Sequence, residues 1–154
     1  MIILQGGLNM KITIMHDPNI TEPEITVKYG YLDNELEDVL TYISLADNRM
    51  AGNLNGETHF IRIADILYFE TVDRRVFFYT SDRTFETKMK IYQIEEKLLN
   101  TPFSRVSKSA IVNLKKVKCI NSESYSRLCA TLVNGEKVIV SRQYLNTIKE
   151  KLGV

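Results

Sequence analysis

The sequence predicts a mainly β protein with a few short helices. Apolar and polar residues alternate over many short segments, which is the pattern of half-buried strands. Turn-forming pairs such as Asn55-Gly56 and Asn134-Gly135 separate these segments. The longest apolar runs, such as Ile66-Leu67-Tyr68-Phe69, are as long as a strand and far too short to span a membrane. With 154 residues, the chain can form one domain with a core, or a domain with a small appendage.

Residues 1–9 are expected to be a mis-annotated leader without function. Gln5-Gly6-Gly7 can be encoded by a purine-rich stretch, and it lies just ahead of Met10-Lys11. That order is typical of a bacterial ribosome-binding site before a start codon. The sequence therefore predicts that the functional chain starts at Met10.

Residues 10–53 are expected to form a small strand-strand-helix segment. Alternation predicts strands over Lys11–Met15 and Ile25–Tyr29. A helix follows, with Asp33 or Asn34 as its cap. Its apolar residues recur at the spacing of one helix face and are Leu36, Val39, Leu40 and Ile43. That face needs a cover, either the main domain or a second copy of the chain, and the second would make this segment a dimerisation element.

Residues 54–154 are expected to form a β-rich domain. The strands expected from residue 50 onward are Met50–Leu54, Glu57–Ile61, Ile66–Glu70, Val76–Thr80, Thr84–Lys88, Arg127–Leu132 and Lys137–Val140. A short helix starts near Ile91 and stops at Asn100-Thr101-Pro102. A final helix follows Ser141, which is expected to cap it. The apolar residues that these helices turn inward are Ile91, Ile94, Leu98, Tyr144, Leu145, Ile148 and Leu152.

Charge is distributed unevenly along the chain. The stretch from Met1 to His59 holds 3 Lys and Arg against 9 Asp and Glu, whereas Phe60 to Val154 holds 17 against 10. The most basic segment, Phe103–Lys118, contains no acidic residue and keeps an apolar rhythm that can anchor it in a core. A basic back half favours a polyanionic partner. Nucleic acid is the commonest such partner and an anionic membrane surface is second.

The sequence offers little for catalysis or metal binding. His16 and His59 lack metal-ligand spacing to each other and to Cys119 and Cys129. The chain has no phosphate-binding glycine loop and no Ser-centred elbow between glycines. We assign no catalytic residue, cofactor, metal or small-molecule substrate. The cysteines are expected to be buried, reduced thiols, although a hairpin that placed them opposite each other would permit redox sensing.

Four ordered motifs carry a resemblance to a known family. They are Asp65–Glu70 (DILYFE), Phe103–Asn113 (FSRVSKSAIVN), Leu132–Gly135 (LVNG) and Val140–Tyr144 (VSRQY). In this order and spacing they resemble a LytTR DNA-binding domain, over roughly Leu54 to Gly153. The resemblance implies an elongated fold of several small antiparallel sheets with a short helix. It also implies that loops entering successive major grooves read bacterial promoter DNA.

The resemblance further implies which side chains contact DNA. The residues that match base-reading positions of the family are Arg75, Lys108 and Arg142, although some relatives carry His in place of Arg75. The planar fork of Arg can bond guanine O6 and N7 together, and Lys can donate to the same acceptors or to phosphate. Secondary or phosphate contacts are expected from Arg74, Arg105, Ser107, Ser109, Asn113, Lys115 and Lys116. The Asn113 amide could instead bridge backbone groups in an irregular turn.

Taken together, these features predict a stand-alone LytTR transcriptional regulator in the bacterial cytoplasm. The roughly fifty residues ahead of the domain are too few for the phosphoacceptor receiver domain of many relatives. The resemblance implies a homodimer on paired DNA repeats, and a regulatory membrane-protein partner of the kind often encoded beside such proteins. The alternatives are a basic β-rich module that binds RNA, an anionic membrane surface or an acidic protein. RNA binding requires exposed aromatic rings, and the consecutive Phe77, Phe78 and Tyr79 must turn some rings outward.

Overall fold

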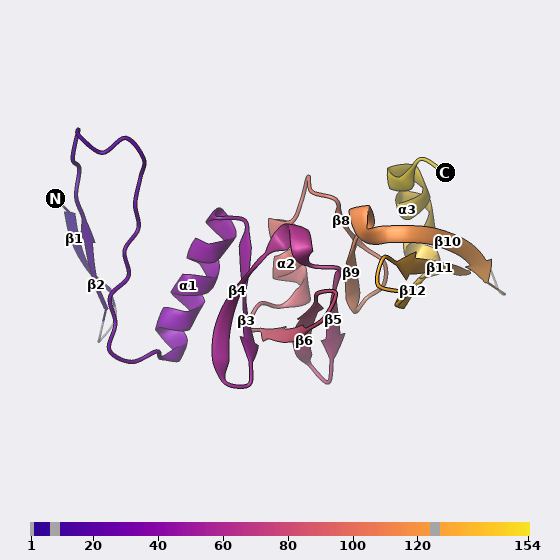
Figure 1. Ribbon diagram of the computed structural model, residues 1–154, viewed down its shortest axis with the longest axis horizontal. Helices are drawn as coiled ribbons and strands as arrows, with labels where there is room; N and C mark the ends of the chain where they lie inside the picture. Colours follow the sequence, from indigo (N-terminus) through magenta and orange to yellow (C-terminus); the bar gives the residue numbers. More distant parts are fainter. Residues whose placement is uncertain (1, 7–9, 124–126) are drawn as a thin grey trace. The chain divides into compact units, whose positions relative to one another are not determined.

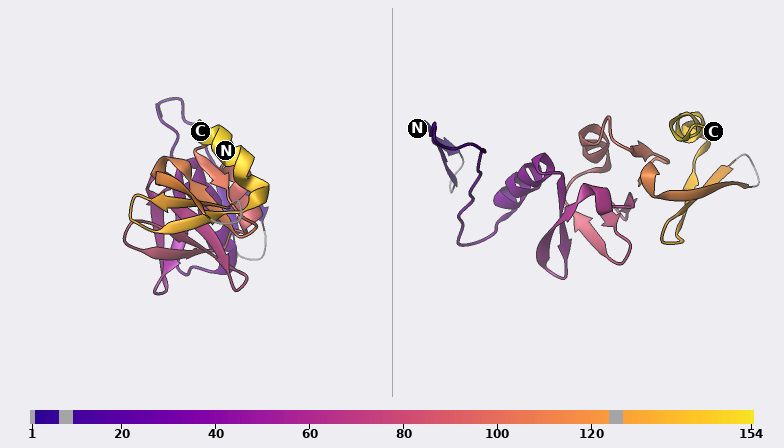
Figure 2. Two further views of the ribbon diagram at one scale, coloured as in Figure 1. Left: turned by 90° about the vertical axis from the view of Figure 1, so that its right-hand side faces the viewer. Right: turned by 45° about the horizontal axis from the view of Figure 1, so that its top comes forward.

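The computed structural model describes residues 2–6, 10–123 and 127–154 (Figures 1 and 2). Its contacts divide the chain into two units, Met1–Leu32 and Asp33–Val154. The helices are α1 (Asn34–Ala46), α2 (Ile91–Lys97) and α3 (Leu145–Leu152), with 3-10 turns at Ile63–Asp65 (η1), Leu114–Lys116 (η2) and Arg142–Tyr144 (η3). The described part of the chain is otherwise built from antiparallel strands, as expected from the sequence.

The first unit contains one antiparallel pair of strands. Strand β1 (Ile2–Gly6) pairs with β2 (Met10–Ile14), so the expected strand near residue 11 is confirmed and its partner lies within the expected leader. The strand expected over residues 25–29 is wrong, because this described segment forms no strand. Ile25 and Tyr29 are exposed, which means that no sheet or core covers their alternating side chains.

Helix α1 belongs to the second unit and covers the sheet there. Asp33 caps it as expected, since Asp33 Oδ1 accepts a hydrogen bond from the Leu36 backbone N–H over 2.8 Å. Lys88 Nζ lies 2.6 Å from Glu37 Oε2 and ties the helix to the sheet. Within this unit α1 packs on β3 (Arg49–Leu54), the strand that follows it, so the two compact units meet after Leu32, while the expected functional boundary after Asn53 stays a prediction (Figures 1 and 2). The residues that α1 buries are Leu36, Thr41 and Ser44.

A seven-stranded antiparallel sheet carries the first core of this unit. Its strand order is β4-β3-β7-β6-β5-β9-β8. The strands are β3 (Arg49–Leu54), β4 (Glu57–Arg62), β5 (Tyr68–Val72), β6 (Arg75–Tyr79), β7 (Thr84–Thr87), β8 (Phe103–Arg105) and β9 (Ala110–Asn113). Phe69, Phe78 and Phe85 are fully buried on one face. Gly52 is required beside them, because a Cβ there would lie 2.4 Å from Phe78 Cζ.

Two tight turns of this sheet have positive φ at both central residues. Asn55 and Gly56 have φ of 54° and 83°, which confirms the expected hairpin between β3 and β4. Asp73 and Arg74 have φ of 49° and 65°, so they form the turn between β5 and β6. Arg75 is consequently the first residue of β6 and not part of the turn.

A second core lies between the seven-stranded sheet, a three-stranded sheet and α3. The three-stranded sheet has the order β10 (Val117–Glu123), β11 (Arg127–Leu132) and β12 (Lys137–Val140), and Figure 2 shows it beside α3. Ile148 of α3 is buried against it, as the sequence predicts for the last helix. The expected cap is wrong, since the Ser141 side chain forms no cap hydrogen bond and η3 leads into α3 instead.

Candidate nucleic-acid interface

Backbone hydrogen bonds bring the three expected base-reading segments together. The Thr71 N–H, at the end of β5, donates to the Ser109 carbonyl over 2.8 Å. The Ser141 N–H, after β12, donates to the Val106 carbonyl over 2.8 Å. The loop 106–109 therefore lies between the β5–β6 turn and the start of η3. Arg75, Lys108 and Arg142 are exposed on these three segments, and we call them the cationic strip.

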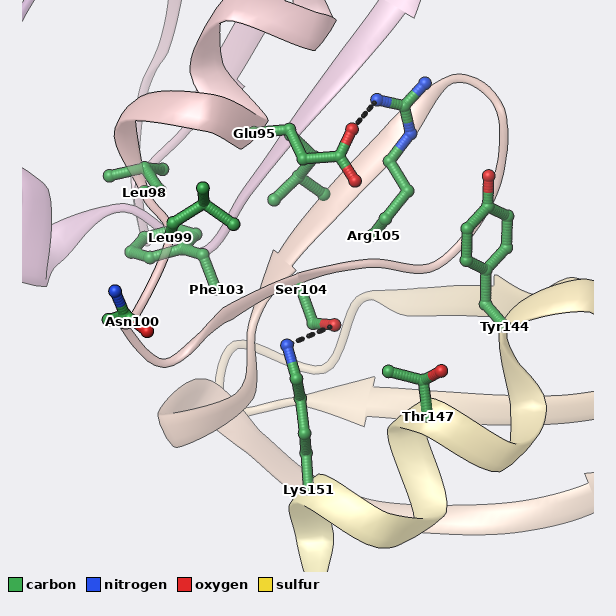
Figure 3. A pocket seen from close by; sticks show the side chains of 11 residues that line it. Glu95, Leu98, Leu99, Asn100, Phe103, Ser104, Arg105, Tyr144, Thr147 and Lys151 are labelled. Carbon is green, nitrogen blue, oxygen red and sulfur yellow. Dashed lines mark hydrogen bonds and ion pairs between the residues drawn. The ribbon is translucent and has the colours of Figure 1, made fainter.

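Arg105 shapes the central loop of the strip, and its pair with Glu95 is drawn in Figure 3. Its Nε donates to the Ser107 carbonyl over 2.8 Å, and its Nη2 donates to the Lys108 carbonyl over 2.6 Å. Its Nη1 pairs with Glu95 Oε2 of α2 over 2.8 Å. The Arg105 side chain is only 15% exposed, so these internal partners engage its guanidinium. The structure thus gives Arg105 a structural task, whereas the sequence suggested a phosphate contact.

The serines of this loop also bond within it. Ser109 N–H donates to Ser107 Oγ over 3.2 Å, and the two hydroxyl oxygens lie 3.3 Å apart. Both residues are half-buried, and Lys108 between them is exposed. The loop is therefore a small rigid platform that projects the Lys108 side chain.

Arg75 is held by two neighbours on the outer face of the sheet. Its Nε donates to Glu86 Oε1 over 2.9 Å, and its Nη2 donates to Glu86 Oε2 over 2.5 Å. The guanidinium carbon also lies 5.2 Å from the centroid of the Phe77 ring. The hydrogen bond and charge of Arg75 lower the pKa of Glu86, which keeps this carboxylate ionised at neutral pH.

A shallow hollow of about 440 Å³ opens beside Arg75. Its charged lining residues are Asp38, Arg74, Arg75, Glu86, Lys88 and Lys90, and its uncharged ones are Asn34, Val76, Thr87 and Met89. Arg74, at the second turn position, is exposed at its edge. The lining of this hollow thus holds four cationic side chains against two carboxylates and is cationic on balance.

Asn113, Lys115 and Lys116 lie at the other end of the β8–β9 hairpin. Asn113 is buried, its Nδ2 donates to the Ile66 carbonyl over 3.0 Å, and its Oδ1 accepts from the Lys115 N–H over 3.2 Å. It therefore bridges backbone groups, the alternative that its sequence context left open. Lys115 is exposed and Lys116 half-buried on η2, beside Pro102 and away from loop 106–109.

The aromatic residues of the outer sheet face include one stacked pair of tyrosines. Phe78 is fully buried, whereas Phe77 and Tyr79 point outward. Tyr79 stacks on Tyr68 with ring centroids 4.2 Å apart and an interplanar angle of 8°. Burial and the nearby Glu70 and Glu136 carboxylates raise the pKa of both tyrosines. An outer face with carboxylates beside stacked rings is a poor platform for RNA bases.

A cavity of about 260 Å³ lies between α2, β8 and α3 (Figure 3). Its polar groups pair across it, since Arg105 contacts Glu95 and Lys151 Nζ lies 3.1 Å from Ser104 Oγ. The Arg105–Glu95 pair joins β8 to α2, and the Lys151–Ser104 contact joins α3 of the second core to β8 of the first.

The two cysteines are not opposite each other. Cys119 pairs with Thr131 and Cys129 with Asn121, so the thiols occupy diagonal positions of the β10–β11 ladder. Cys129 is buried as expected, but Cys119 is exposed, against the expectation. Burial and the nearby Glu123 raise the pKa of the Cys129 thiol. A diagonal pair is typically too far apart for a disulfide.

Two absences hold for the part of the chain that the structure describes, residues 2–6, 10–123 and 127–154. No group of three or more His, Cys, Asp or Glu in that part of the chain could hold a metal ion. Among the same residues, no helix is long and apolar enough to cross a membrane.

Sequence reasoning missed Glu86, Phe77 and Glu95 as parts of this interface. Glu86 faces Phe77 only because β6 and β7 pair in one particular register. Glu95 meets Arg105 only because α2 packs near β8. The sequence held one signal for Glu86, namely a glutamate that faces an aromatic residue across a predicted hairpin.

Comparisons with known proteins identify a family and several relatives. A family model described as the LytTr DNA-binding domain matches residues 56–153. An uncharacterized HTH-type transcriptional regulator of Staphylococcus aureus strain NCTC 8325 is 27% identical over 147 residues, covering 94% of this chain and 99% of that protein. A similar regulator of strain MRSA252 is 26% identical over the same length and shares.

A solved structure gives the same fold. It is the LytTr DNA-binding domain of a putative methyl-accepting/DNA response regulator from Bacillus cereus, with a TM-score of 0.66 and 23% identity. The match covers 70% of this chain and 98% of that structure. The matched family is one of DNA-binding domains and not an enzyme family. The mainly antiparallel fold, the ordered motifs and the family match lead to one conclusion: the chain belongs to the LytTr DNA-binding domain family.

Proposed function

We propose that the protein is a cytoplasmic transcriptional regulator that binds double-stranded promoter DNA in a sequence-specific way. The observation that carries this proposal is the cationic strip, in which two backbone hydrogen bonds join the segments of Arg75, Lys108 and Arg142. Membership of a DNA-binding family supports the duplex as partner, and the regulator names of the Staphylococcus relatives support a role in transcription.

The chemistry of the strip suits the major groove. Each arginine offers a planar fork that can bond guanine O6 and N7, a pattern that only a G·C pair presents. Lys108 stands on a platform fixed by Arg105 and can reach a base acceptor or a phosphate. Three cations on separate segments can follow successive positions along a groove.

Selection of DNA by the intact protein tests this proposal. A library of duplexes with randomised cores is bound, eluted and sequenced, and the enriched duplex is compared with the unselected library. Arg142→Ala should weaken binding to the enriched duplex by about 1–3 kcal/mol and change binding to the unselected library much less. Failure to enrich any sequence, or equal weakening on both DNAs, would contradict the proposal. Single-stranded RNA and anionic vesicles in the same assay test the alternatives.

A further inference from the structure

The ion pair between Arg75 and Glu86 leaves a defined set of donors on the arginine. A guanidinium carries five N–H groups, one on Nε and two on each Nη. Glu86 accepts from Nε and Nη2, which is a side-on contact that uses one N–H of each. Two N–H groups on Nη1 and one on Nη2 remain. One from each nitrogen points in parallel along the end of the guanidinium, and this distal fork matches guanine O6 and N7.

The surroundings fix the direction of that fork. Alternate residues of a strand share a face, so Arg75 and Phe77 lie on the same outer face, and the register places Glu86 directly opposite Phe77. The Phe77 ring lies near the guanidinium, and the Glu86 carboxylate holds its side edge. An exposed arginine without such neighbours samples many rotamers and meets bases and phosphates alike.

We propose that Glu86 is the positioning residue of Arg75, and that it sets base preference by presenting the distal fork of Arg75 to the major groove. This inference rests on the proposed function. Glu86 also cancels the charge of Arg75, so the pair gains little from phosphate attraction on DNA of any sequence. The carboxylate thereby raises the difference between the preferred sequence and all others.

Glu86→Gln tests this role in the full chain, with duplexes of randomised core as the probe. Arg75→Ala identifies the base position that depends on Arg75, because preference at that position is lost. Glu86→Gln should lose preference at the same position, and the affinity ratio of enriched to unselected duplex should fall on the order of three- to tenfold. In the Arg75→Ala background, Glu86→Gln should leave the remaining ratio unchanged.

Two further variants separate positioning from charge. Glu57→Gln removes the same charge on the edge strand β4 and should select the same sequences as the wild type. Glu86→Asp keeps the charge but shortens the reach to Arg75. Both variants should lose the same base position, but only Glu86→Gln, which removes the negative charge, should also gain affinity for unselected DNA. Both substituted positions are on the surface of the sheet, so melting curves should match the wild type and verify the fold.

The outcomes distinguish this inference from the proposed function. If Arg75→Ala loses a base position and Glu86→Gln does not, the positioning role is overturned while DNA recognition stands. If Glu86→Gln sharpens the preference, the carboxylate blocks Arg75, and the inference is equally overturned. If the wild type enriches no sequence, the proposed function fails and this inference fails with it.

Discussion

At the scale of single residues, arginines in this protein have separate tasks. Arg105 bonds the carbonyls of the Lys108 loop and pairs with Glu95, so its guanidinium has structural partners, while its phosphate contact stays a prediction. Arg75 is exposed and presented by Glu86. The sequence could assign both to the interface through the family motif. It could not separate their tasks, because the difference depends on partners that lie elsewhere in the sequence.

Arg105→Lys distinguishes a platform residue from a phosphate contact. Lysine keeps the charge but lacks the planar fork that bonds the Ser107 and Lys108 carbonyls together. We expect a stability loss of about 1–3 kcal/mol and weaker DNA binding, measured by thermal melting and by titration with the enriched duplex. Glu95→Gln is the control, because it keeps both carbonyl bonds and should bind DNA nearly as the wild type. Wild-type binding by Arg105→Lys would show that only the charge matters.

Lys115 and Lys116 remain predicted phosphate contacts. They lie away from the cationic strip, so their role depends on whether the duplex reaches η2. If it does, alanine at either position should weaken binding to enriched and unselected duplexes alike, and should reduce the log–log salt slope by about one unit per residue. If the salt slope of these variants is unchanged, Lys115 and Lys116 do not contact phosphate, and this prediction is wrong.

At the scale of secondary-structure elements, the sequence correctly predicted the features that residues close together in the chain determine. The hairpins expected at Asn55-Gly56 and Asn134-Gly135 both formed, and the strands Arg127–Leu132 and Lys137–Val140 have the expected bounds. The strand over residues 25–29 failed because alternation is not enough without a sheet edge to pair with. The cover of α1 was left open and proved to be β3, since tertiary packing decides which face of a helix is buried.

The stacked tyrosines on β5 and β6 predict a loss of stability at alkaline pH. Burial and nearby carboxylates raise the pKa of Tyr68 and Tyr79, so the folded state favours their neutral forms. This contribution is complete below the ordinary tyrosine pKa of about 10 and is lost as the pH rises above it. Denaturant unfolding from neutral to alkaline pH should show a decline that is shallower for Tyr68→Phe. Parallel curves for the two proteins would refute this origin.

At the scale of the whole molecule, one strand contributes side chains to both cores within residues 33–154, because successive side chains of a strand point to opposite faces. Strand β9 sends Ile111 into the core of the seven-stranded sheet, and sends Ala110 and Val112 into the core shared with α3. The cationic strip crosses this junction, since Arg75 belongs to the first sheet and Arg142 follows the last strand. The backbone hydrogen bonds and packing at this junction therefore set the spacing between the two arginines. The sequence showed the motifs in order, but only the register shows how they meet.

Dimerisation stays a prediction. The boundary between the two units shows which deletion can test it. Removing α1 would uncover β3 and disturb the fold, so the informative deletion ends at Leu32. The apolar stripe of Val39, Leu40 and Ile43 is half-buried on α1 and survives this deletion. We expect the shortened protein to keep its melting temperature, its affinity for one site and its cooperativity on two-site DNA. Loss of cooperativity alone would move the dimer contact to residues 1–32.

Amide chemical-shift mapping shows whether duplex DNA contacts the cationic strip. Isotopically labelled protein is titrated with the enriched duplex, and the unselected library serves as the reference. The largest perturbations should fall together on residues 74–76, 106–109 and 141–143, which the two backbone hydrogen bonds hold side by side. Perturbations confined to residues 114–118, or spread without regard to these three segments, would contradict the account.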